Sequence, residues 1–125
     1  MPRHKRQRLV HDLPGYTRFS PEGEPFVENT AVVMTIEEYE AIRLMDHQGM
    51  TQEECAGYME VGRTTVQQIY VDARRKLAEA LVEGRPLLIQ GGEYRLCDGT
   101  GPHCGQGGCH RYGRGCGHYE NKHIP

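Results

Sequence analysis

A row of hydrogen-bonding side chains recurs at helical spacing near the middle of the chain. Arg63, Thr64, Gln67 and Gln68 are followed by Val71, and these positions share one face of a helix. In the major groove of DNA, an arginine side chain can pair with guanine and a glutamine side chain with adenine. The spacing therefore predicts a base-reading face. The alternative is a helical hairpin in another kind of all-α domain.

A second group of reactive side chains lies near the carboxyl end. Its cysteines have the spacing C-x6-C-x4-C-x6-C, with histidines beside two of them: Cys97, His103, Cys104, Cys109, His110 and Cys116. Thiolates and imidazoles are the ligands of structural zinc, whereas sets of thiolates also hold iron–sulfur clusters. Zinc is the expected ion, an iron–sulfur cluster or redox role is the alternative, and a disordered tail is the third reading.

The residues around the polar row predict a helix-turn-helix from Thr51 to Arg75. Ala56 is small enough for the closest approach of two steeply crossed helices, and Glu60-Val61-Gly62 forms a short corner. Thr51 and Glu54 predict a capping box at the start of the first helix. Apolar side chains from both helices are expected beneath the corner: Cys55, Met59, Val61, Val66 and Ile69.

Helices are also expected before and after this corner. Thr35 and Glu38 predict a capping box for a helix that ends near Gly49. Its charged residues are expected to face solvent: Glu37, Glu38, Glu40 and Arg43. The helix that begins at Gly62 or Arg63 should continue to Gly84, which is long for a recognition helix. Arg74 and Arg75 on this helix are within reach of DNA phosphates.

The net charge of −2 conceals an uneven distribution along the chain. The first eighteen residues carry five Lys or Arg against one acid, whereas residues 19–60 carry ten acids against one Arg. Residues 1–34 therefore read as a basic extended arm broken by prolines, with a disordered tail as the alternative. We expect four of its basic residues to contact phosphates: Arg3, Lys5, Arg6 and Arg8.

Residues 85–96 change the pattern to short apolar runs around Gly91-Gly92. These runs predict a short β-hairpin, with one extended segment docked on the helices as the alternative. No apolar run reaches membrane-spanning length and no signal peptide is evident, so a cytoplasmic protein without membrane contact is expected. Catalytic motifs are also missing from the sequence, and an enzyme is not expected.

With these residues in view, the chain resembles a family of small prokaryotic proteins, domain of unknown function 134, from about Arg3 to Gly92. The family is predicted to bind DNA, and its helix-turn-helix is similar to region 4 of sigma factors. Glu60 departs from the glycine usual at the corner, and Gly62 departs from the usual serine cap. The residues that carry the resemblance follow the basic start: Phe19-Ser20-Pro21-Glu22-Gly23, Thr35, Glu37, Glu40, Ala41, Arg43, Leu44, Asp46, Gln52-Glu53-Glu54, Ala56, Met59, Val61, Arg63, Thr65, Ala73-Arg74-Arg75-Lys76, Ala78, Ala80-Leu81, Gly84 and Gly91-Gly92.

The sequence thus predicts a mainly α fold, with a three- to four-helix helix-turn-helix domain at residues 35–84 and a Gly/Cys/His-rich tail at residues 97–125. The expected function is a transcriptional regulator that binds double-stranded DNA as a homodimer and responds to a metal in one version of the hypothesis. Two alternatives stay open. One is a metal or redox sensor whose tail controls assembly, and the other is a module that docks on RNA polymerase.

Overall fold

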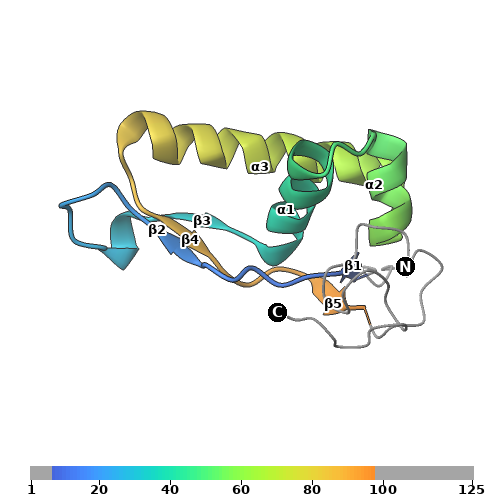
Figure 1. Cartoon of the computed structure of the whole chain (residues 1–125), viewed down its shortest axis with the longest axis horizontal. Helices are drawn as coiled ribbons and strands as arrows, with labels where there is room; N and C mark the ends of the chain where they lie inside the picture. The colour runs from blue at the N-terminus through green and yellow to red at the C-terminus, as the bar shows by residue number, and fades with distance from the viewer. Residues whose placement is uncertain (1–6, 98–125) are drawn as a thin grey trace, which may run out of the picture.

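A long helix, α3 (Arg63–Glu83), lies across a layer of short strands and two shorter helices (Figure 1). The computed structural model describes residues 7–97 of the chain. Helix α1 (Ile36–Ala41) continues directly into a π-helical segment, η2 (Ile42–His47), and α2 (Gln52–Met59) follows. Along residues 7–97, no helix combines the length and apolar character needed to cross a lipid bilayer.

The two predicted capping boxes are present and fix where α1 and α2 begin. The Thr35 hydroxyl accepts from the Glu38 backbone N–H, and the Glu38 carboxylate accepts from the Thr35 backbone N–H. Thr51 and Glu54 make the same pair of bonds at α2. Each box satisfies N–H groups that the first turn of a helix would otherwise leave unbonded. These two predictions are confirmed.

Short strands from both ends of the described chain pair with one another. Strand β1 (Arg8–Val10) pairs in parallel with β5 (Tyr94–Leu96). In a second sheet, β4 (Leu87–Ile89) lies between β2 (Arg18–Phe19), which is antiparallel to it, and β3 (Val32–Met34), which is parallel to it. A 3-10 turn, η1 (Glu28–Thr30), precedes β3. The fold is therefore mixed α/β, and the prediction of a mainly α fold needs this correction.

The predicted hairpin at residues 85–96 is wrong, because its two strands pair elsewhere. All three residues of β4 are buried, so this strand takes partners on both sides from residues 18–34. An isolated two-stranded hairpin would leave those apolar side chains without cover. Gly91 and Gly92 do not form the hairpin turn. They carry the chain past the start of α1, where the Gly91 carbonyl accepts from the Ile36 N–H at 2.9 Å.

The segment expected as an extended arm supplies core residues as well. Val10, Val32 and Met34 are buried against Ala73 of α3 and the apolar residues of β4. A second cluster lies where α2 meets α3 and includes the predicted residues Cys55, Met59, Val66 and Ile69, with Val61 packed beside it. The strands thus support the second half of α3, while its first half packs on α2 (Figure 1).

A buried ion pair joins α1 to η2, and the residue that follows β1 bonds to it. Both nitrogens on one edge of the Arg43 guanidinium donate to the two carboxylate oxygens of Glu40 at 2.9 Å. Glu40 is fully buried and Arg43 is 6% exposed, and the backbone N–H of His11 donates to Glu40 at 2.8 Å. The His11 ring bonds the Tyr58 carbonyl of α2 through Nε2 at 2.8 Å. This network joins the residue after β1 to α1, η2 and α2.

The four charged residues of α1 and η2 that were expected to face solvent are all buried: Glu37, Glu38, Glu40 and Arg43. The prediction is wrong because β1 and the segment around Gly92 cover this side of the helix. Each buried charge has a partner of opposite sign or a backbone donor, as burial requires. Lys76 of α3 bonds Glu38 at 2.8 Å, and the Glu93 N–H donates to Glu37 at 3.1 Å.

Candidate nucleic-acid interface

The predicted reading residues lie together on the exposed side of α3. Arg63, Thr64, Gln67, Gln68 and Val71 are all exposed, while Val66, Ile69 and Ala73 on the other side of the same helix are buried. Arg74 and Arg75 continue the exposed side by one more turn. We call these seven residues the α3 outer face. It offers guanidinium, hydroxyl and amide groups, the side-chain types that contact base edges and phosphates in DNA.

A short corner joins α2 to α3 and sets the direction of the α3 outer face. Glu60 has φ 57° and ψ 45°, the left-handed conformation that usually ends a helix at glycine. The Val61 N–H then bonds the Ala56 carbonyl at 3.1 Å, and Gly62 caps α3 without a side-chain hydrogen bond. The predicted corner is thus present, with a strained non-glycine residue at its centre.

The charge of Glu60 is directed to a partner on the strand side. Its carboxylate accepts from the Arg95 guanidinium of β5 at 2.5 Å. The Glu60 side chain is 30% exposed and the Arg95 side chain is 46% exposed. The ion pair offsets the negative charge that Glu60 would otherwise present beside the corner.

Gln52, which the sequence did not mark as a site residue, reaches from α2 to the α3 outer face. It is the first residue of α2, and its side-chain nitrogen donates to the Arg63 carbonyl at 3.2 Å. The same nitrogen donates to Oε1 of Gln67 at 3.4 Å. A glutamine at the start of α2 was visible in the sequence. Its partners depend on how the two helices cross, so the spacing alone could not assign them.

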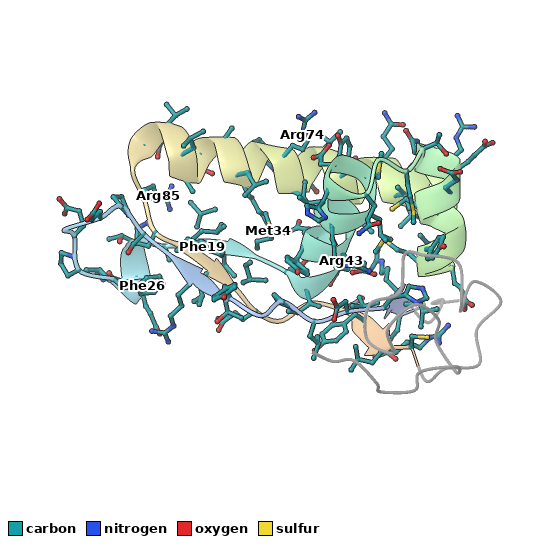
Figure 2. The ribbon with its side chains drawn as sticks, in the orientation of Figure 1. Phe19, Phe26, Met34, Arg43, Arg74 and Arg85 are labelled. Atoms are coloured by element: carbon teal, nitrogen blue, oxygen red, sulfur yellow. The ribbon has the colours of Figure 1, made fainter. Side chains whose placement is uncertain are left out.

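Arg74 points outward from α3 and packs on a neighbouring ring (Figure 2). Its guanidinium lies 5.3 Å from the centre of the Tyr70 ring, and its Nε is 3.5 Å from a carboxylate oxygen of Asp46 in η2. The Tyr70 hydroxyl donates to Asp46 at 2.7 Å, and this bond raises the pKa of Tyr70. Asp46 therefore holds an arginine that was predicted to contact phosphate.

A second aspartate binds two other members of the α3 outer face. Oδ1 of Asp72 accepts from the Gln68 amide at 3.1 Å and from the Arg75 guanidinium at 3.2 Å. Arg63 is 3.9 Å from Glu53 of α2, and both of these side chains are mostly exposed. Exposed pairs of this kind contribute little to stability and are readily exchanged for other partners.

Comparison with known proteins places the chain in a family. Residues 1–97 match the family model described as protein of unknown function DUF134. The chain belongs to the DUF134 family. A UPF0251 protein of Desulfitobacterium hafniense is 55% identical over 117 residues, which cover 94% of this chain and 93% of the relative. A UPF0251 protein of Pelotomaculum thermopropionicum is 49% identical over 96 residues, 77% of this chain and 73% of the relative. No solved structure gives a significant match.

The basic residues at the start of this DUF134 chain are not all placed alike. Arg8 lies in β1, and its guanidinium is 3.5 Å from Glu93 and 4.0 Å from Glu37. Its side chain is only 17% exposed and is not part of the α3 outer face. Arg3, Lys5 and Arg6 lie outside the described residues, so their predicted phosphate contacts stay predictions.

The cysteines of this DUF134 chain fall into two groups. Cys55 is fully buried at the α2–α3 contact, where burial raises the pKa of its thiol to about 12 and keeps it neutral. Cys97 is also buried, and its N–H donates to the Val10 carbonyl at 2.8 Å. The other predicted ligands lie outside the described residues: His103, Cys104, Cys109, His110 and Cys116. Within residues 7–97, no three His, Cys, Asp or Glu side chains are grouped to hold a metal ion.

Proposed function

We propose that this protein binds double-stranded DNA through the α3 outer face and regulates transcription. The observation that carries the proposal is the division of α3 into a buried apolar side and an exposed side of basic, amide and hydroxyl groups. A helix that packs on one side and offers such groups on the other suits the major groove. The short corner after α2 and the long support beneath α3 agree with this role.

In this proposal the α3 outer face divides its work between base edges and phosphates. Arg63, Thr64, Gln67 and Gln68, with Val71, read base edges near the start of the helix. Arg74 and Arg75 contact phosphates of the DNA backbone one turn later. Such contacts position the helix and carry no base preference. The sigma-region-4 resemblance supports the same orientation of α3.

Selection of preferred sequences from random DNA, with and without a chelator, tests the proposal directly. An enriched sequence supports DNA reading, and its loss with chelator supports control by zinc or another metal held by the carboxyl-terminal cysteines and histidines. Recovery of no preferred sequence contradicts DNA reading. Enrichment that requires added RNA polymerase would instead support the docking module.

Binding as a homodimer is part of the proposal, since helix-turn-helix units usually recognise paired half-sites. Leu81 and Val82 near the end of α3 are 81% and 80% exposed, and these apolar side chains are accessible to a second copy. A selected sequence with two-fold symmetry would support the dimer. A single asymmetric site would contradict it.

Replacing Gln67 should change sequence choice, whereas replacing Arg74 should not. We expect Gln67→Ala to lose about 1–3 kcal/mol of discrimination at one base pair. Arg74→Ala should weaken binding to every sequence and lower the salt dependence by about one phosphate contact. Titration of operator and scrambled DNA at several salt concentrations separates these effects. Equal losses on all sequences for both variants would contradict the division of roles.

Removing the negative charge at Asp46 should strengthen DNA binding. Arg74 is paired with Asp46 at 3.5 Å, and a phosphate must displace this carboxylate. We expect Asp46→Asn to raise affinity for all sequences about two- to fivefold, the worth of one exposed ion pair. Tyr70→Phe is the matched control, because it removes the hydrogen bond to Asp46 and leaves its charge. Fluorescence anisotropy would detect the change, and an unchanged affinity for Asp46→Asn would exclude competition by this carboxylate.

A further inference from the structure

We propose that Gln52 is a positioning residue that orients the Gln67 amide for recognition of adenine. The inference rests on the proposed function and names the base that one residue of the α3 outer face selects. Its evidence is the pair of hydrogen bonds that the Gln52 side chain makes across the two helices.

The Gln52 side chain connects the start of α2 to the first turns of α3. Its nitrogen carries two hydrogens, and the two bonds to the Arg63 carbonyl and to Oε1 of Gln67 use both of them. Gln52 is half-buried, while Gln67 is exposed beyond it. We call this pair of hydrogen bonds the tether. It comes from a residue held between the two helices, and it acts on Gln67, which is exposed and accessible to a ligand.

The tether selects one of the two orientations of the Gln67 amide. The last torsion of a glutamine side chain has a broad, roughly two-fold preference, so an isolated amide exchanges its oxygen and nitrogen readily. Turning the Gln67 amide over would bring its N–H groups against the N–H groups of Gln52. Two donors cannot bond each other, so the orientation with Oε1 toward Gln52 is preferred.

The selected orientation leaves the groups that adenine needs. The bond from Gln52 uses one lone pair of Oε1, and the other lone pair and both N–H groups of Gln67 stay available. Adenine presents a donor and an acceptor side by side in the major groove, which one amide oxygen and one amide nitrogen can meet together. Guanine presents two acceptors there, and the oxygen of an oriented amide faces them unfavourably.

The test compares base preference in proteins that carry or lack the tether. Wild-type selection, repeated with Gln67→Ala, first identifies the base pair that Gln67 reads. Gln52→Met, which is similar in length but has no N–H, should lower the adenine preference at that base pair about two- to tenfold, the range for one hydrogen bond. Affinity for scrambled DNA and the melting temperature should not change. Gln90→Met is the matched control, because this exposed glutamine follows β4 and lies outside the α3 outer face.

A double variant separates orientation from an independent contact. If Gln52 acts through Gln67, Gln52→Met in the Gln67→Ala background should have no further effect on base preference. A uniform loss of affinity on all DNA, or a further loss in the double variant, overturns the inference. If the methionine variant melts at a lower temperature, Gln52→Leu provides a second side chain without an N–H donor and without a new charge. A wild-type protein that selects no sequence contradicts the proposed function itself, whereas a Gln67-dependent preference that survives in both Gln52 variants contradicts only the tether.

Discussion

Replacing Glu40 with alanine is expected to lower the free energy of unfolding by about 3–5 kcal/mol, the cost of removing one partner from a buried ion pair. Arg43 would keep its charge in a site where it is 6% exposed, without the carboxylate that accepts from its Nε and Nη2. The His11 backbone N–H would lose its acceptor as well. Urea denaturation monitored by circular dichroism measures the change.

Loss of the Arg43 proton cannot relieve this cost. Burial lowers the pKa of Arg43, but the hydrogen bonds and charge of Glu40 and the charge of Asp12 raise it further, so that the pKa lies above its ordinary value. Arg43 stays protonated when Glu40 is absent, because the ordinary pKa of an arginine lies far above the pH range in which the protein is studied. The charge must therefore be accommodated by disrupting the local structure.

The matched control replaces both partners with apolar residues of similar size. Glu40→Leu combined with Arg43→Met should recover most of the stability, because no charge is left buried. A single variant that loses less than about 1 kcal/mol would show that water enters and solvates Arg43. The predicted DNA contacts lie on the α3 outer face, so the single variant should lose binding by unfolding and keep its sequence preference below its melting temperature.

Features that depend on local signals were predictable from the sequence. Each capping box is complete within four residues, and the α3 outer face follows from helical spacing alone. The corner was also predictable, although Glu60 occupies a conformation that costs most residues about 1–2 kcal/mol. Arg95 contributes an ion pair there, but it lies 35 residues away, and no local pattern connects the two.

Features that depend on distant segments were not predictable. The charges on α1 were expected in solvent because a short helix with several acids usually has one exposed face. Their burial results from β1 and the segment around Gly92, which lie at opposite ends of the described chain. The same cause explains the wrong hairpin. The short apolar runs show that two strands are present. Their pairing partners depend on which apolar surface remains uncovered in the rest of the fold.

Gly92→Ala is expected to lower the free energy of unfolding by about 2–5 kcal/mol, which combines backbone strain with overpacking. Gly92 has φ +106°, a backbone angle that residues with a Cβ rarely adopt. A Cβ here would also lie 2.8 Å from the Thr35 Cβ and 2.1 Å from the Glu37 carboxylate. The variant should unfold at a lower temperature and at a lower urea concentration than the wild type.

Gly91→Ala separates strain from crowding, because Gly91 has a similar positive φ of +76° and open space around its Cβ position. It should cost about 1–2 kcal/mol, the strain alone. The difference between the two variants measures the close approach of Gly92 to Thr35 and Glu37, and the Glu37 carboxylate accepts from the Glu93 N–H at 3.1 Å. Equal losses would mean that Thr35 and Glu37 both move away from position 92 at little cost.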